Sequence, residues 1–172
     1  MRLATVLACC IGMGLVSGVV ASRSQQPTLP VAKTLVLSKQ AQRFLALQYR
    51  EFSTEFMGCM IGEVRGSTVV VERIAPADVD SAASRPTRVV PTRNCEDSGW
   101  TGVVGIIHSH PGGERCFYYF PTTVVPSSDG ASFAMNEYPV DAIMCGTKVV
   151  WIARDAKEHE LELKGLHLFV SR

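Results

Sequence analysis

The sequence lacks an excess of charge of either sign, since 17 lysines and arginines stand against 16 aspartates and glutamates. Proteins that bind nucleic acids usually carry a basic patch or stripe that neutralises phosphates, and none is visible here. The charge balance therefore argues against a nucleic-acid partner. The chain also has no internal repeat and no low-complexity tract, and its 172 residues suffice for one domain with a sizeable core.

Three familiar metal-site patterns are missing as well. No two cysteines have Cys-x-x-Cys spacing, which disfavours a structural zinc–thiolate site. The stretch "HELEL" that begins at His159 lacks the second histidine of a zincin helix. The His-x-Glu and Pro-Cys-x-x-Cys pattern of zinc deaminases is absent too. His159 and His167 stand alone in the sequence, and we interpret both as ordinary surface or core residues with no role in a metal site.

An apolar run fills residues 3–20 behind the single charge of Arg2, and small residues close it at Ala21. This pattern predicts a secretory signal peptide over residues 1–21. The alternative is an uncleaved membrane anchor, because the run nearly reaches spanning length, but its glycines make it a weak anchor. Cleavage would leave no stable membrane span and a net charge of zero. We therefore expect an exported protein, periplasmic or secreted.

Four cysteines lie beyond the predicted cleavage point: Cys59, Cys95, Cys116 and Cys145. An even number in an exported protein favours disulfides, and four cysteines allow three pairings. Cys95 and Cys116 lie in polar, loop-like stretches on either side of the histidine segment, so the pairing favoured is Cys95–Cys116. Cys59 and Cys145 lie in apolar runs, which is typical of small core residues.

The remaining pattern predicts a flexible lead-in over residues 22–33 and one domain over residues 34–172. A helix is expected in "LSKQAQRFLALQYRE", with Ser38 as its cap, and a second in "SSDGASFAMNE". Strands are expected in "EFMGCMIGEV", "TVVVERIAPA", "GVVGIIHSH", "VDAIMCG", "KVVWIARD" and "ELELKGLHLFV". A long loop over residues 77–99 is expected to hold one short strand at 88–90. The fold class is α/β (α+β), with a single mixed sheet flanked by helices.

The segment "GIIHSHPGG" places His108 and His110 two residues apart at the end of an expected strand. Residues i and i+2 of a strand project from the same face, so the two imidazoles lie together. Neutral imidazoles are good zinc ligands, and a catalytic zinc takes about three protein ligands. Asp129, which opens the second expected helix, is the best candidate for the third ligand, although a carboxylate in a first helical turn is common without any metal. Glu55, which leads an apolar strand, is the candidate general base.

These residues resemble the JAMM/MPN metalloprotease family. Its pattern is a glutamate that leads a Gly-x-x-x-Gly strand, then His-Ser/Thr-His-Pro, then Ser-x-x-Asp. The stretches "EFMGCMIG" and "HSHP" match the first two parts, and "SSD" resembles the third. The resemblance covers roughly residues 35–153 and includes the order of helices and strands. It implies that His108, His110 and Asp129 bind one zinc ion per chain. It also implies that Glu55 is the general base that takes a proton from the zinc-activated water.

Two departures from the family pattern affect the site. The gap between His110 and Asp129 is longer than usual, and it holds an aromatic insertion that includes Cys116. The serine expected three residues before Asp129 is replaced by Pro126. In the family this serine helps to stabilise the tetrahedral intermediate. We assign that role to Ser127, with Ser128 as the alternative.

The resemblance implies an exported zinc-dependent peptidase or isopeptidase that acts on a peptide or on a protein tail. The alternative is a binding or scaffold module on the same fold, because some family members lack the metal set. Retention of Glu55, His108, His110 and Asp129 together favours the enzyme. The altered serine favours the scaffold.

Overall fold

The computed structural model of the chain describes residues 31–113 and 115–163. The predicted signal peptide, most of the predicted lead-in, and His167 lie outside these residues. The described part contains two helices, α1 (Lys39–Glu51) and α2 (Ser128–Met135). It contains the strands β1 (Thr34–Leu37), β2 (Met57–Arg65), β3 (Thr68–Pro76), β4 (Val103–Ser109), β5 (Val140–Cys145), β6 (Lys148–Ala153) and β7 (Glu158–Glu162).

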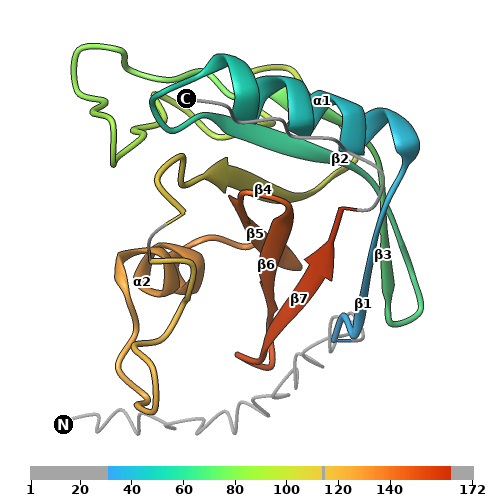
Figure 1. Cartoon of the computed structure of the whole chain (residues 1–172). Helices are drawn as coiled ribbons and strands as arrows, with labels where there is room; N and C mark the ends of the chain where they lie inside the picture. Colours follow the sequence, from blue (N-terminus) through green and yellow to red (C-terminus); the bar gives the residue numbers. More distant parts are fainter. Residues whose placement is uncertain (1–30, 114, 164–172) are drawn as a thin grey trace, which may run out of the picture.

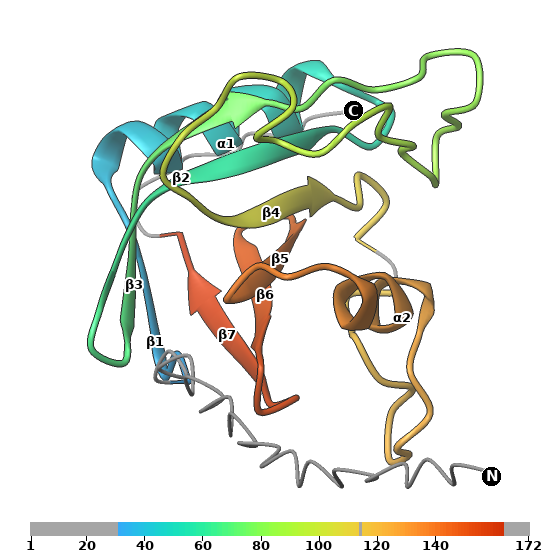
Figure 2. The same ribbon diagram turned by 180° about the vertical axis from the view of Figure 1, so that it is seen from behind.

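All the strands belong to one mixed sheet with the order β1-β3-β2-β4-β5-β6-β7. The β1–β3 and β4–β5 pairs are parallel, and the other neighbours are antiparallel. The predicted single mixed sheet flanked by helices is therefore confirmed. Figure 1 shows α1 along the top of the molecule beside β2, and α2 at the lower left beyond the end of β4. The reverse view in Figure 2 shows the same arrangement.

The central strands of the sheet, β4, β5 and β6, are buried on both faces. Side chains on alternate positions of β2 to β6, such as Met60, Ile107 and Met144, join Ala41 and Leu45 of α1 in the main apolar cluster. The intervening positions, such as Ile143 and Ile152, pack with Phe133 of α2 and Tyr118 on the opposite face. The histidines of β4 alternate with Ile107, so they belong to this second face.

The first helix begins as the sequence predicts. The hydroxyl of Ser38 accepts a hydrogen bond from the backbone N–H of Ala41 at 3.0 Å, which satisfies one of the free amides of the first turn. The helix then runs to Glu51 and buries Ala41 and Leu45 against the sheet.

Two details of the predicted elements differ from the structure. Strand β1 was not predicted, because its four residues pair in parallel with β3 across 34 positions of sequence, a contact that local periodicity does not reveal. The short strand expected at 88–90 was wrong. Residues 77–102 form only isolated bridges, Val79 with Pro91 and Arg85 with Arg88.

The cysteine pairing also differs. The favoured Cys95–Cys116 bridge is wrong, since the disulfides are Cys59–Cys95 and Cys116–Cys145. Each bridge joins a cysteine in an apolar strand to a cysteine in a long loop. Cys59 and Cys145, which we interpreted as simple core residues, therefore attach the two loops to the sheet. The loop 77–102 is tied to β2 and the loop 110–127 to the end of β5. Two such bridges are typical of proteins that fold in an oxidising compartment.

Among the described residues, no helix has the length and apolar character needed to cross a membrane.

We predict that replacing both Cys59 and Cys95 by alanine lowers the free energy of unfolding by about 3–4 kcal/mol, because the bridge closes a long loop in the unfolded chain. The bridge spans a sequence separation of 36, and its cysteines are 0% and 3% exposed. Urea denaturation of the oxidised protein measures the change. An unfolding midpoint equal to that of the unaltered protein would contradict a stabilising role for this bridge.

Candidate metal centre

Two imidazoles and one carboxylate converge at the end of β4. The Nε2 atom of His108 lies 3.6 Å from Oδ1 of Asp129, and Nε2 of His110 lies 3.6 Å from Oδ2 of the same carboxylate. The ligand-type atoms of the three residues all lie within 4.8 Å of one another. The structure therefore brings together the three residues that the sequence predicts as metal ligands.

Glu55 reaches this cluster from the segment that precedes β2. Met57 pairs with His108 across the β2–β4 ladder, and Glu55 lies two residues before Met57 on the same side of the chain. Oε1 of Glu55 lies 3.7 Å from Nε2 of His110, while Oε2 accepts a hydrogen bond from the backbone N–H of Val89 at 3.0 Å. One carboxylate oxygen is thus held by the loop 77–102, and the other faces the histidines.

Ser109, between the two histidines, fixes the chain beside Glu55. Its backbone N–H donates to the carbonyl of Phe56 at 3.0 Å, and its hydroxyl oxygen accepts from the N–H of Phe56 at 3.1 Å. On the other side, the hydroxyl of Tyr49 in α1 donates toward the carbonyl of His110 at 3.0 Å. The backbone on both sides of the histidines is therefore held by side-chain hydrogen bonds.

Asp129 is positioned by the start of α2. The helix is capped by Ser127, whose hydroxyl accepts from the N–H of Gly130 at 3.2 Å. A Cβ atom on Gly130 would lie 2.2 Å from the carbonyl oxygen of Tyr118, so only glycine allows this close approach. The N–H of Ser127 donates to that same carbonyl at 2.7 Å. Helix α2 is thereby pressed against the loop 110–127, with Asp129 turned toward the histidines.

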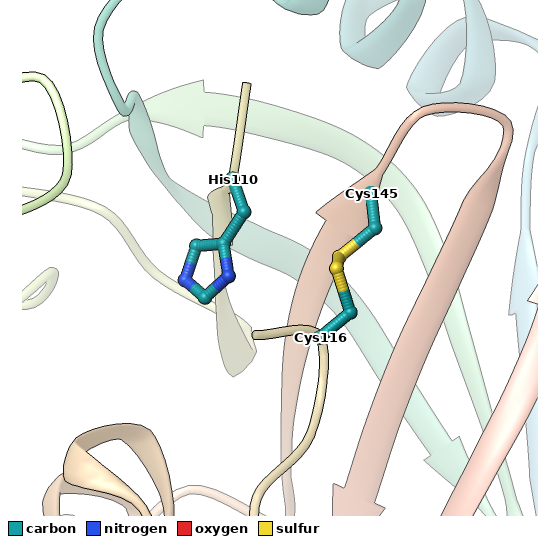
Figure 3. A group of neighbouring side chains, drawn as sticks. All are labelled: His110, Cys116 and Cys145. Atoms are coloured by element: carbon teal, nitrogen blue, oxygen red, sulfur yellow. A yellow bond between two sulfur atoms is a disulfide. The ribbon is translucent and has the colours of Figure 1, made fainter. Parts of the chain in front are cut away.

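The loop 110–127 is long but is held to the rest of the molecule at several points. These contacts explain how Asp129 reaches the histidines although the sequence between His110 and Asp129 is unusually long. The carboxylate of Glu158 in β7 accepts hydrogen bonds from the N–H groups of Tyr118 and Tyr119 at 2.8 and 2.7 Å. The Cys116–Cys145 disulfide ties the loop to β5. Figure 3 shows this disulfide beside the imidazole of His110. The insertion therefore delivers Asp129 to the histidines as part of a fixed framework.

The geometry of the three residues fits zinc. Two ligand atoms bound tetrahedrally to one zinc ion lie about 3.4 Å apart, given zinc–ligand distances near 2.0–2.1 Å. The 3.6 Å separations between Asp129 and each histidine are close to this value and are longer than a hydrogen bond. Within the described residues, Nε2 of His108 is buried and makes no hydrogen bond. An orphaned, buried imidazole nitrogen beside a carboxylate is what a metal ligand requires.

The electrostatic environment favours a cation. Burial lowers the pKa of His108, but the carboxylates of Asp129, Asp141 and Glu55 outweigh it, and the net pKa is raised. Burial raises the pKa of Asp129, but His108, His110 and Arg115 outweigh it, and the net pKa is lowered. Both shifts show that this position stabilises positive charge among carboxylates.

The opposing effects on the pKa of Glu55 have a different outcome. Burial raises the pKa of its carboxyl group, and the opposing effects of His108 and the Val89 amide are too small to restore the ordinary value. A carboxylate with a raised pKa holds a proton more readily than an exposed glutamate does, which suits a general base.

The sequence pattern gave no reason to single out Asp141 and Tyr118, which lie behind the site. Burial raises the pKa of Asp141 to about 6, partly opposed by His108 and by the Tyr118 hydroxyl, which donates to its Oδ1 at 2.8 Å. The only signal in the sequence is an aspartate at the second position of an otherwise apolar strand. Asp141 adds negative charge beside His108 and anchors the ring of Tyr118.

The two candidate serines differ in their surroundings. Ser127 is 7% exposed, and its hydroxyl caps α2 and donates to the carbonyl of Phe117 at 3.0 Å. Ser128 is exposed and lines the same pocket as Asp129. Both serines line the pocket, but the hydroxyl of Ser127 is engaged in the helix cap and in the bond to Phe117, whereas Ser128 is exposed.

The cluster forms the floor of a pocket of about 900 Å³. One wall is the continuous stretch of residues 87–95, and the opposite wall comes from α2 and the loop before it. In Figures 1 and 2 the end of β4 lies between these two segments. A pocket of this size accommodates a peptide-sized ligand.

Residues 37–117 match the family model described as prokaryotic homologs of the JAB domain. The matched range contains Glu55, His108 and His110. Among solved structures, the solution structure of protein DSY2949 from Desulfitobacterium hafniense is similar at 20% sequence identity, with a TM-score of 0.46. The similarity covers 74% of this chain and 90% of that one. No curated protein matches the chain.

We predict that the purified protein binds about one zinc ion per chain and that His108→Ala and Asp129→Ala each abolish stoichiometric binding, because each removes one of three ligands. Isothermal titration with zinc measures the affinity and stoichiometry. Asp155→Ala, an exposed aspartate in the turn after β6, is the matched control and should bind zinc as the unaltered protein does. Equal zinc binding by Asp129→Ala and Asp155→Ala would refute ligation by Asp129.

Proposed function

We propose, from the match of residues 37–117 to prokaryotic homologs of the JAB domain, that this chain is a JAMM/MPN family member and a zinc-dependent hydrolase of peptide or isopeptide bonds. The observation that carries the proposal is the convergence of Glu55 with His108, His110 and Asp129 at the floor of one pocket. A scaffold on this fold has no need of a metal-ligand set with a buried carboxylate beside it.

The residues divide the chemical work among them. A zinc ion held by His108, His110 and Asp129 would supply Lewis acidity, which polarises a carbonyl group and makes water a stronger acid. Glu55 has one oxygen fixed by Val89, so its other oxygen faces the reacting water and accepts the proton. After the amide bond breaks, the same carboxyl group passes the proton to the leaving amine.

The developing oxyanion needs a hydrogen-bond donor. Ser127 would have to give up its bond to the carbonyl of Phe117 to act, and that bond helps to hold the loop against α2. Ser128 is exposed beside Asp129 and carries no such structural task. We therefore favour Ser128 over Ser127 for this role, which moves the expected donor by one residue.

The substrate is expected to be a peptide or the tail of a protein. The consecutive residues 87–95 all line the pocket. An extended peptide can lie along such a wall with its scissile bond over the histidines. The two disulfides and the expected signal peptide support a location outside the cytoplasm.

One observation favours the alternative of a binding module. Pro126 stands where the family has its serine, and the adjacent Ser127 is engaged in the helix cap. A module that only binds a protein tail would use the same pocket without turnover. The variants described next distinguish a hydrolase from a binding module.

We predict that Glu55→Gln lowers kcat by about 10²- to 10⁴-fold, because it removes the proton acceptor, while zinc binding is retained. Peptide and isopeptide substrates tested with the zinc-loaded protein give the rates. Glu51→Gln, an exposed glutamate at the end of α1, is the matched control. Full activity in Glu55→Gln would rule out the proposed base.

We predict that substitution of Ser128 affects catalysis and that substitution of Ser127 affects stability. Ser128→Ala should lower kcat about 10-fold or more without changing the melting temperature, because it removes an oxyanion donor from an exposed position. Ser127→Ala should lower the free energy of unfolding by about 1 kcal/mol through loss of the helix cap. Steady-state kinetics and thermal unfolding of the two variants test this assignment. Unchanged kcat in Ser128→Ala would return the oxyanion role to Ser127.

A further inference from the structure

His110 lies between two sets of metal-ligating groups. Besides His108 and Asp129, its imidazole lies beside the sulfur atoms of Cys116 and Cys145, and one ligand-type atom from each of these three residues lies within 4.8 Å of the others. Figure 3 shows the two sulfurs joined as a disulfide beside the ring. One histidine nitrogen and two cysteine sulfurs form a ligand set that zinc accepts when the cysteines are thiolates.

The two disulfides differ in their accessibility. Cys59 and Cys95 are 0% and 3% exposed, so their bridge is sealed inside the molecule. Cys116 and Cys145 are both partly exposed. Because thiol–disulfide exchange requires an attacking thiolate to reach a sulfur atom, the partly exposed bridge is the one that a reductant reaches first.

Reduction leaves the two sulfurs near His110. Cys145 ends β5, whose neighbour His110 donates its backbone N–H to the carbonyl of Met144 at 2.9 Å. Cys116 lies in a loop that Glu158 holds two residues further on. Two thiolates on one zinc ion are about 3.8 Å apart, given zinc–sulfur distances near 2.3 Å, so the two sulfurs must move apart after reduction before both bind one ion.

We propose that reduction of the Cys116–Cys145 disulfide creates a second metal site formed by His110, Cys116 and Cys145. A dithiol reductant donates two electrons and two protons to the bridge and becomes a cyclic disulfide, while the S–S bond breaks to give two thiols. Metal binding then releases the thiol protons. The site exists only in the reduced protein.

This site competes with the one already described, a consequence that rests on the proposed zinc site. Both sets contain His110, whose imidazole lies within reach of both in a single orientation. Its Nε2 atom faces Asp129, so a metal ion on the cysteines that takes this nitrogen removes it from the first set, and the reduced protein then lacks the complete proposed zinc-ligand set. The disulfide thereby restricts metal-dependent activity to an oxidising environment.

The test uses Co²⁺ as the probe, because thiolate ligands give an intense near-ultraviolet charge-transfer absorption that nitrogen and oxygen ligands do not. The protein is the full chain with Cys9→Ser and Cys10→Ser, so that only the four cysteines of the domain remain. A phosphine reductant, which binds metals weakly, replaces the dithiol. We expect no charge-transfer absorption in the oxidised protein and a band that saturates at about one Co²⁺ per chain after reduction.

Variants identify the residues that give rise to the charge-transfer band. It should persist in Cys59→Ala/Cys95→Ala, the matched control that keeps the other pair, and in Asp129→Ala. It should vanish in Cys116→Ala/Cys145→Ala. His110→Ala keeps both disulfides, so it folds without loss of a bridge, and after reduction it should bind Co²⁺ at least 10-fold more weakly.

The outcomes are distinct. A reduced protein without the band, a band that survives Cys116→Ala/Cys145→Ala, or equal affinity in His110→Ala overturns the second site. Failure of the oxidised protein to bind any Co²⁺ overturns the proposed function instead, and the band of the reduced protein is still measured. Both ligand sets are supported if oxidised Asp129→Ala loses Co²⁺ binding while reduced Asp129→Ala shows the band.

Discussion

The position of β4 between β2 and β5 is the constraint on which the site depends. On one side, the antiparallel register sets His108 opposite Met57, and the two hydrogen bonds between Ser109 and Phe56 extend this pairing beyond the strand. On the other side, the parallel pairing of β4 with β5 requires Gly105, where a Cβ would lie 2.4 Å from the carbonyl oxygen of Val140. A slip of one residue would turn the histidines to the opposite face, into the cluster packed against α1. The geometry of the candidate site thus depends first on the sheet register and second on the loops.

Local patterns were enough to predict much of this arrangement. Ser38 caps its helix, the apolar runs form strands, and the alternation along β4 places both histidines on one face. Asp129 was a candidate because it opens the second expected helix and Glu55 because it leads an apolar strand, and the family resemblance favoured both. These are features with a short range along the chain, which periodicity and capping residues report directly.

What sequence reasoning missed depends on contacts between distant segments. The parallel pairing of β1 with β3 and both disulfides are of this kind. Polar surroundings suggested that Cys95 and Cys116 share a bridge, but each is held against a different part of the sheet by the loop that carries it. The pairing of Tyr118 with Asp141 was likewise invisible, because an isolated aspartate in an apolar strand gives no sign of its partner.

The carboxylate of Glu158 extends the candidate site to the edge of the sheet. It belongs to β7, the last described strand, and it holds the loop that leads to Asp129. Together with the Cys116–Cys145 disulfide and the start of α2, it fixes the position of that loop. The place of the proposed third ligand therefore depends on a strand whose residues do not line the pocket, so a disturbance of this edge of the sheet reaches the candidate metal centre as well.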